Sequence, residues 1–217
     1  SRIYGEVKAT NQTNGTNMSN PGLIANQTVA PLALPTHDRA AQVAAATVAL
    51  TASNASCSSG TRTWPANVKI TGNVSVQGSC KVTVDGDAWI TGSLTVQNSA
   101  ELIVKNGLTS PPVIMVDGAN GVELKNSALL RSNNGTPPIG FRVITYWSNS
   151  ACTTAQPSCE LTGVDLANSR DNETIEIENS ASGPNTEFYA KWTALALENS
   201  GNVGALVAQT VKLQNSA

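Results

Sequence analysis

The sequence predicts an all-β protein: a parallel β-helix (β-solenoid) with about 20 residues per coil and a short N-terminal capping helix. Three observations predict this fold. The phrase "LTVQNSA" at residues 94–100 returns with small changes at residues 122, 175, 195 and 211. Short runs of alternating apolar residues recur at a constant interval, as stacked strands require. Charged residues make up only 13% of the 217 residues and aromatic residues only 4%, which suits a narrow β-architecture with many turns.

The first segment, residues 1–35, is expected to be an extended polar arm that precedes a domain of residues 36–217. It is rich in Asn, Thr and Pro. Its start, "RIYGEV", alternates in the manner of a strand. Ile3, Gly5 and Val7 are therefore predicted to add as a strand to the sheet of a neighbouring copy.

The run "PTHDRAAQVAAATVAL" predicts a helix over residues 37–50. Thr36 is the expected N-cap, Asp38 lies in the first turn, and Val43 and Leu50 share one face. This helix is expected to cover the open apolar end of the first coil.

Short strands follow from residue 68 onward. The intervals 68–88, 74–94, 82–102, 94–114, 102–122 and 175–195 are all 20 residues, which predicts three strands in each coil. An antiparallel sandwich is the alternative, but it has no reason to keep a constant interval. The expected first positions of the strands are Val68, Val74, Val82, Ala88, Leu94, Leu102, Ile114 and Val122.

The corners between strands require a left-handed backbone, which Gly and Asn tolerate best. Gly fills this position in "ITGN", "VQGS" and "VDGD", and Asn replaces it in the repeated phrase. Stacked coils would align these amides in a hydrogen-bonded ladder. The predicted corner residues are Asn98, Asn126, Asn179, Asn199 and Asn215.

The four cysteines fit no zinc-binding spacing. Cys152 and Cys159 would close the short loop "CTTAQPSC", inside an insertion of about residues 148–172 that interrupts the repeat. Cys57 and Cys80 remain as the second pair. Disulfides predict an oxidising compartment, so the protein is expected to be extracellular or at the cell surface.

Asn-x-Ser/Thr sequons agree with that compartment. Four of them lie before residue 30, where a glycan-coated tail and a plain polar tail are both consistent with the sequence. The candidate glycosylation sites are Asn11, Asn14, Asn17, Asn26, Asn54, Asn73, Asn134 and Asn172.

The repeat also resembles a known family. The run "VKITGNVSVQGSCKVTVDGDAWITGSLTVQNSAELIVKNG" and the run "FYAKWTALALENSGNVGALVAQTVKLQNSA" look like the β-solenoid domain of PilX-like bacterial surface proteins, which are associated with type IV pili. The resemblance covers about residues 64–217. It implies an extracellular, pilus-associated and non-enzymatic role. The polar start "SRIYGEVKATNQT" departs from the family, whose members begin with a long hydrophobic helix.

Catalytic groups are not expected in this chain, nor are a metal or a cofactor. Asp85 and Asp87 flank Gly86 as turn residues do, although with Asp117 they offer oxygen ligands of the kind calcium prefers. His37, the one histidine, has no nucleophile tied to it by a motif. The acidic run "SRDNETIEIEN" is interpreted as a solvated strand face.

Composition excludes two further classes of partner. The 13 Lys and Arg residues are scattered and the net charge is −2, so no nucleic-acid partner is expected. The longest apolar stretch, residues 40–50, is too short to cross a bilayer, so no membrane span is expected.

The last strand and turn, "TVKLQNSA", carry no visible cap, which predicts a docking end at Val211, Leu213 and Asn215. A fold-back or a boundary of the sequence would explain the same ending. The leading hypothesis is a structural subunit or accessory of an extracellular filament or pilus, with itself or other pilus subunits as partner. The alternative is a carbohydrate-binding or adhesive module that contacts surface glycans through Tyr146, Trp147 and the insertion.

Overall fold

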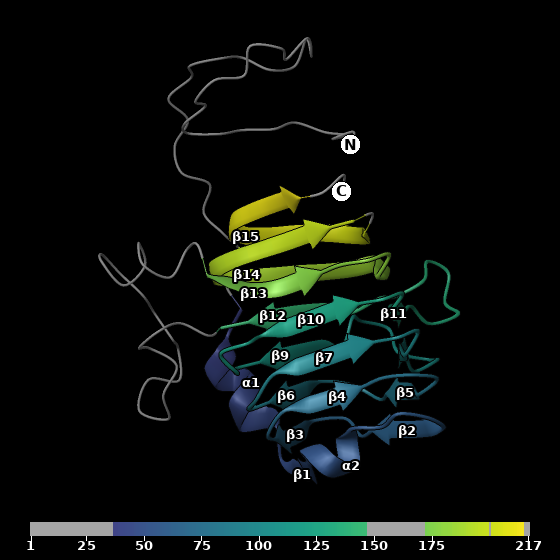
Figure 1. Cartoon of the computed structure of the whole chain (residues 1–217). Helices are drawn as coiled ribbons and strands as arrows, with labels where there is room; N and C mark the ends of the chain where they lie inside the picture. The colour runs from purple at the N-terminus through teal and green to yellow at the C-terminus, as the bar shows by residue number, and fades with distance from the viewer. Residues whose placement is uncertain (1–36, 147–171, 200, 215–217) are drawn as a thin grey trace, which may run out of the picture. The chain divides into compact units, whose positions relative to one another are not determined.

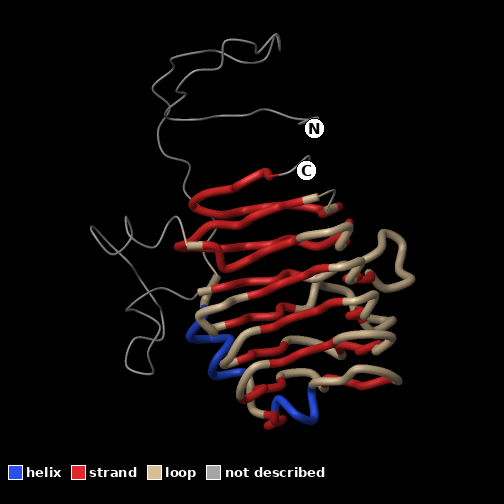
Figure 2. The backbone as a smooth tube through the Cα atoms, in the orientation of Figure 1, coloured by secondary structure: helices blue, strands red, loops and turns tan. Residues whose placement is uncertain are grey.

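A computed structural model describes residues 37–146, 172–199 and 201–214 (Figure 1). The chain divides between Thr36 and His37, so all described residues belong to one unit. Their strands join in one 15-stranded sheet in which every pairing is parallel. The sheet curls around a single core (Figure 2). The prediction of a parallel all-β fold is confirmed.

The strands stack in three columns, which the chain visits in a fixed order. Column A holds β1 (Val48–Thr51), β3 (Val68–Thr71), β6 (Ala88–Ile90), β9 (Val113–Val116) and β12 (Arg142–Thr145). Column B holds β4 (Val74–Val76), β7 (Leu94–Gln97), β10 (Val122–Lys125) and β13 (Glu173–Ile177). Column C holds β2 (Thr61–Trp64), β5 (Lys81–Val84), β8 (Glu101–Val104) and β11 (Leu129–Arg131). The long strands β14 (Ser182–Glu198) and β15 (Asn202–Gln214) bend through all three columns.

The interval between paired residues is 20 at both ends of the stack. Val48 pairs with Val68 and Val74 with Leu94 at one end, and Ser182 pairs with Asn202 at the other. Further along β14 and β15, two register shifts shorten the interval to 16, as between Leu195 and Val211. In the middle, longer corners lengthen the interval, as between the linked amides of Asn98 and Asn126, which are 28 residues apart. The step from β10 to β13 spans residues 147–171, so Asn126 and Asn179 are 53 residues apart.

Two of the expected 20-residue intervals are therefore wrong. Ile114 pairs with Ala88 in column A, and not with Leu94. Val122 pairs with Leu94 in column B, and not with Leu102. Both predicted intervals joined strands of different columns, because the longer corners after β8 and β9 shifted the next strands along the chain. The intervals 68–88, 74–94, 82–102 and 175–195 are confirmed.

The core consists of the inward side of each strand. Val74 and Val76, Val82 and Val84, and Leu94 and Val96 are at most 2% exposed, as the alternating pattern predicts. Three buried hydroxyl groups lie among these apolar side chains. Thr174 Oγ1 bonds to Thr145 Oγ1 at 2.8 Å and to Thr193 Oγ1 at 2.5 Å, so each hydroxyl has a partner.

The predicted asparagine corners are confirmed at every described position. Asn98, Asn126, Asn179 and Asn199 have φ angles of 50–59°, in the left-handed region. Their amides form the expected ladder, with N–O distances of 3.3, 3.4 and 3.1 Å from one coil to the next. The fifth corner residue, Asn215, lies outside the described residues.

The predicted helix over residues 37–50 is only partly correct. α1 spans Arg39–Ala45, and the N-cap is Asp38, whose carboxylate accepts from the Ala41 N–H, and not Thr36. Residues 48–51 form strand β1, because Val48 and Leu50 pair with β3 and continue column A.

α1 also lies along the side of the sheet and not over its end (Figure 1). The Arg39 guanidinium contacts the Asp117 carboxylate at 2.5 Å, with both side chains at most 9% exposed. The Gln42 amide donates to Asp87 at 3.3 Å. These contacts fix α1 across β6 and β9 of column A.

Candidate assembly interface

The two ends of the sheet differ from the rest of the described surface. Among the described residues, the exposed large hydrophobic side chains are Val48 in β1 and Val211 and Leu213 in β15. Figure 1 shows β1 with the short helix α2 (Ala52–Ala55) at one end and β15 at the other. Each end strand has a neighbour on one side only within the described part of the chain.

β15 continues the stack, but its inward-facing side chains have no strand on their far side within the described residues. Its Val211 and Leu213 pair with Leu195 and Leu197 of β14, which are 0% and 8% exposed. Val211 and Leu213 are 44% and 48% exposed because no described strand covers them. Burying such side chains is favourable by about 25 cal/mol per Å2 of apolar area, so this end favours a further strand. The inner row of β15 consists of Val203, Leu206, Ala208, Val211 and Leu213.

The outer row of β15 carries a single charge. Lys212 is the only charged residue of Asn202–Gln214, and its ammonium contacts the Glu173 carboxylate at 2.7 Å. Native sheets commonly blunt an edge with charges or Pro. The inward-facing positions of β15 hold neither a charged residue nor a proline.

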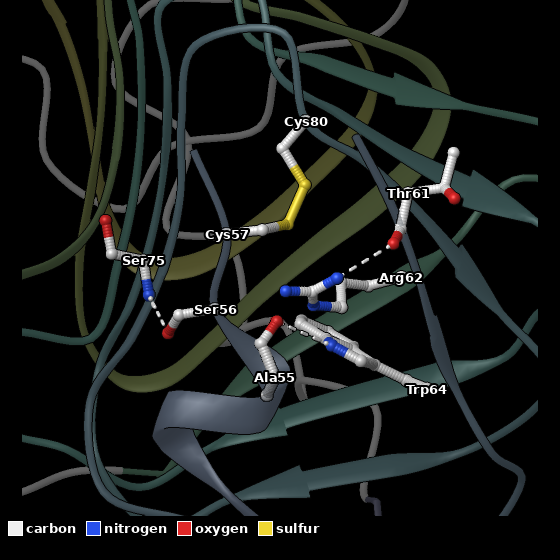
Figure 3. Close-up of a disulfide and its surroundings, with 8 residues drawn as sticks. All are labelled: Ala55, Ser56, Cys57, Thr61, Arg62, Trp64, Ser75 and Cys80. Carbon is white, nitrogen blue, oxygen red and sulfur yellow. Dashed lines mark hydrogen bonds between the residues drawn. A yellow bond between two sulfur atoms is a disulfide. The ribbon is translucent and has the colours of Figure 1, made fainter. Parts of the chain in front are cut away.

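The opposite end is closed by a compact cap (Figure 3). The Trp64 ring is fully buried, and its indole N–H donates to the Ala55 carbonyl at the end of α2, at 3.1 Å. The predicted disulfide between Cys57 and Cys80 is confirmed, and it ties this cap to column C. Arg62 pairs with the inward-facing Val82, so a charged and exposed side chain occupies an inner position.

The remaining predicted interface and disulfide residues cannot be placed. Ile3, Gly5, Val7, Asn215, Cys152 and Cys159 lie outside the described residues. The same holds for the sequons at Asn11, Asn14, Asn17 and Asn26. Asn54, Asn73 and Asn134 are exposed, and Asn172 is half-buried.

An acidic surface on column B was not foreseen as a cluster. Glu123 of β10 pairs with Glu176 of β13, and with Glu178 their carboxylate oxygens lie within 4.8 Å of one another. Burial, and then the charges of Glu173 and Glu178, raise the pKa of Glu176 above its ordinary value of 4.5. The run "ETIEIEN" signalled an acidic strand face, but only the β10–β13 pairing brings Glu123 to it. The carboxylates of Glu123, Glu173 and Glu176 line a groove of about 440 Å3, together with Asn73, Ser75, Thr95 and Asn120.

The three aspartates that the sequence offered as possible calcium ligands, Asp85, Asp87 and Asp117, each bond to a neighbouring part of the chain. Asp117 accepts from Arg39 and from the Trp89 indole N–H, the latter at 2.7 Å. Asp87 accepts from the Val113 N–H at 2.8 Å, and Asp85 contacts Lys105 at 2.7 Å. The three side chains hold neighbouring elements together and do not share a site.

His37 packs against column A. Its ring meets the Tyr189 ring edge-on at 4.7 Å, and its Nε2 lies 3.9 Å from the Glu187 carboxylate. Burial, and then the charge of Arg142, lower the pKa of His37 below 6.5. The contacts are those of a packed side chain.

Most of the tyrosine and tryptophan side chains in the described part of the chain are buried. Tyr146 is 1% exposed, and its hydroxyl donates to the His37 carbonyl. Trp64 and Trp192 are at most 8% exposed, while Trp89 is half-buried under the Lys69 ammonium. The described part of the chain therefore presents no row of exposed rings. Trp147 lies outside it.

None of the helices within the described residues has the length and apolar character needed to span a membrane. No protein-family model, curated protein or solved structure matches the chain.

Proposed function

We propose that the protein is a non-enzymatic structural component of an extracellular filament or pilus, assembled through the open β15 end of its sheet. The observation that carries this proposal is the location of the exposed apolar side chains. Within the described residues, Val48, Val211 and Leu213 all belong to end strands. Val211 and Leu213 lie two residues apart at the β15 end, and exposed apolar side chains at the open end of a stack favour association.

The fold in this proposal is a β-solenoid of about 20 residues per coil, interrupted by longer corners. Parallel pairing across three columns, the asparagine ladder and the 20-residue intervals at both ends support it. In this reading each passage through columns A, B and C is one coil. α1 is then a side brace at the N-terminal end of the domain, and α2 with Trp64 is the cap.

Two features support an extracellular or cell-surface location. A disulfide such as Cys57–Cys80 persists where the environment is oxidising, and three sequons lie at exposed asparagines. The resemblance of residues 64–217 to PilX-like proteins supports an association with pili. A protein outside the cytoplasm that self-associates through strand edges fits the disulfide, the sequons and this resemblance.

Self-association of the full chain tests the proposal. Negative-stain electron microscopy and sedimentation velocity should show fibres or end-to-end oligomers at micromolar concentration. The double variant Val211→Lys, Leu213→Lys should remain folded and monomeric, because it places two charges at the inner row. The matched control Asn202→Lys, Gln209→Lys adds the same charge to β15 outside its column B edge and should still assemble. A wild-type chain that stays monomeric at high concentration contradicts the proposal.

A further inference from the structure

We propose that residues Gly5–Lys8 of a second copy occupy the free edge of β15 in column B. They continue the parallel register with Gly5 over Val211, Glu6 beside Lys212, Val7 over Leu213 and Lys8 beside Gln214. This inference rests on the proposed function and names the occupant and register of its interface. The partner is thus an extended strand with an acidic residue between two small or apolar ones.

Column B offers the longest straight edge on β15. Ala194 to Glu198 of β14 pair with Thr210 to Gln214, whereas column A offers Ala205–Ala208 and column C only Asn202 and Val203. Four residues suffice for a strand in this stack, since β1, β5 and β7 have four each. An added strand would pair with the backbone N–H and C=O groups on the far edge of β15, as in other cases of β-augmentation.

The inner row restricts the register. A strand over β15 must place apolar or small side chains above Val211 and Leu213, which lie two residues apart on the same side. The segment "RIYGEVK" has such residues at alternate positions: Ile3, Gly5 and Val7. Within residues 2–8, two parallel registers satisfy the row, one with Ile3 and Gly5 above it and one with Gly5 and Val7.

Charge selects between these two registers. The residue beside Lys212 is Tyr4 in the first register and Glu6 in the second. The Lys212 side chain is 31% exposed and its ammonium contacts Glu173, and an ammonium has three N–H groups with which it can also donate to a carboxylate on a neighbouring strand. Opposite charges on neighbouring strands are favourable, by about 0.2–1 kcal/mol. Lys8 would then stand beside Gln214, in the row that continues to Glu198 of β14.

The capped end at β1 and β2 explains why β15 would bind an extended segment and not the opposite end of another copy's sheet. The cap of α2, Trp64 and the Cys57–Cys80 disulfide occupies the first coil, and Arg62 holds an inner position there. Stacking this end on β15 would bury the Arg62 charge against apolar side chains, at a cost of several kcal/mol. An arm from a neighbouring copy avoids that cost.

Cysteine pairing tests the register in the full chain. A Val7→Cys chain is mixed with a Leu213→Cys chain under mild oxidation, and the cross-linked peptides are identified by mass spectrometry. The expected product joins position 7 to position 213. A Gly5→Cys chain mixed with Leu213→Cys reports the other register, and should give at least 5-fold less product.

Each other outcome overturns the inference in a distinguishable way. A dominant cross-link from position 5 to position 213 gives the wrong register, and a 213–213 product means that two β15 edges meet. Assembly without any of these cross-links removes the arm from the interface while the proposed function stands. Absence of assembly in every chain overturns both.

A charge reversal provides the second readout. Glu6→Lys should weaken association at least 3-fold in sedimentation, because it sets two ammonium groups beside each other. Association of Glu6→Lys equal to that of the wild type would overturn the Glu6–Lys212 contact. The control Glu6→Gln should fall between the wild type and Glu6→Lys.

Discussion

At the scale of single residues, Glu176 shows how stacking creates electrostatic strain that the sequence does not reveal. It faces Glu123 across the β10–β13 pair, Glu173 begins the same strand, and Glu178 follows the strand's end. Only part of this charge is compensated: Lys125 contacts Glu123, and Lys212 contacts Glu173. Like charges in adjacent positions of a sheet are destabilising.

We therefore predict that Glu176→Gln raises the free energy of unfolding at pH 7 by about 0.5 kcal/mol. The pKa of Glu176 is raised in the folded protein, so the folded state binds its proton more tightly than the unfolded state. The stability from that proton is complete below pH 4.5 and is lost as the pH rises through the raised pKa. Urea unfolding from pH 4 to pH 8 measures this slope.

The variant should flatten that part of the pH profile, because it removes the titrating group. Glu173→Gln is the control, since it removes a carboxylate that has Lys212 as partner and should give no stabilisation at pH 7. Equal pH profiles for Glu176→Gln and the wild type would contradict the prediction.

The asparagine corners were predictable at this scale because the constraint is local. Asn at a left-handed position has a sterically defined role, and the repeated "NSA" identified it. The serine after each asparagine was not identified, although Ser99, Ser127 and Ser180 also have positive φ angles of 64–66°. Ser has no special preference for that region, so only the completed corner requires it.

The corner at Asn126 yields a second prediction. Its φ is 53°, and its amide is linked to Asn98 and Asn179. Asn126→Gly keeps the backbone conformation and loses the two exposed hydrogen bonds, whereas Asn126→Ala also incurs about 1 kcal/mol of left-handed strain. Thermal unfolding should therefore rank wild type above Gly and Gly above Ala. Ala equal to Gly would mean that the corner relaxes out of the left-handed region.

At the scale of elements, the alternating strands were predicted well and the helix poorly. Val74, Val82 and Leu94 began or adjoined strands because alternate burial imposes a period of two. The helix prediction failed after Ala46 because local propensity favoured helix in "AAATVAL", while pairing with β3 stabilised residues 48–51 as strand β1. Tertiary pairing overrides weak propensity.

The capped end yields a third prediction. Cys57 and Cys80 are 23 residues apart and join the segment after α2 to the residue before β5. Replacing both by Ala should lower the free energy of unfolding by about 3 kcal/mol, because the cross-link restricts the unfolded chain. Denaturant unfolding measures this change. Cys152→Ala with Cys159→Ala is the control, since it separates the effect of this cap from that of the other two cysteines.

Hydrogen exchange should locate the change. Loss of protection in α2 and β2, with little change in β9 and β10, is expected if the disulfide stabilises the cap alone. A uniform loss of protection along the stack would show instead that the cap controls the stability of the whole unit.

At the scale of the whole unit, the sequence predicted the stacking but not which strands are neighbours. A repeat is visible where corners are short, as at Gly72–Asn73 between β3 and β4. Longer corners, such as residues 105–112 and 117–121, preserve the stack while they change the interval, so numerical spacing alone paired Leu94 with residue 114. For the same reason the cluster of Glu123 with Glu176 was not predicted, whereas Val211 and Leu213 were identified by position alone.

The last prediction concerns residues 147–171. The residues just before and just after this segment already bond within the same stack. Thr145 and Thr174 bond to each other at 2.8 Å, and the Ala194 N–H donates to the Asn172 carbonyl at 2.8 Å. A short corner can therefore join β12 to β13. Replacing residues 147–171 with Thr-Gly-Ser leaves five residues between the two strands, the same number as residues 117–121 between β9 and β10.

This shortened chain should fold with the same parallel sheet, and its free energy of unfolding should change by no more than about 1 kcal/mol, since loop length affects closure entropy only weakly. Circular dichroism and thermal unfolding measure this, and an insertion of the same Thr-Gly-Ser between Gly72 and Asn73 serves as a control for disturbing a corner. Loss of cooperative unfolding in the shortened chain alone would show that residues 147–171 form part of the core. Retained folding would mean that this segment is free to vary independently of the stack that carries the β15 interface.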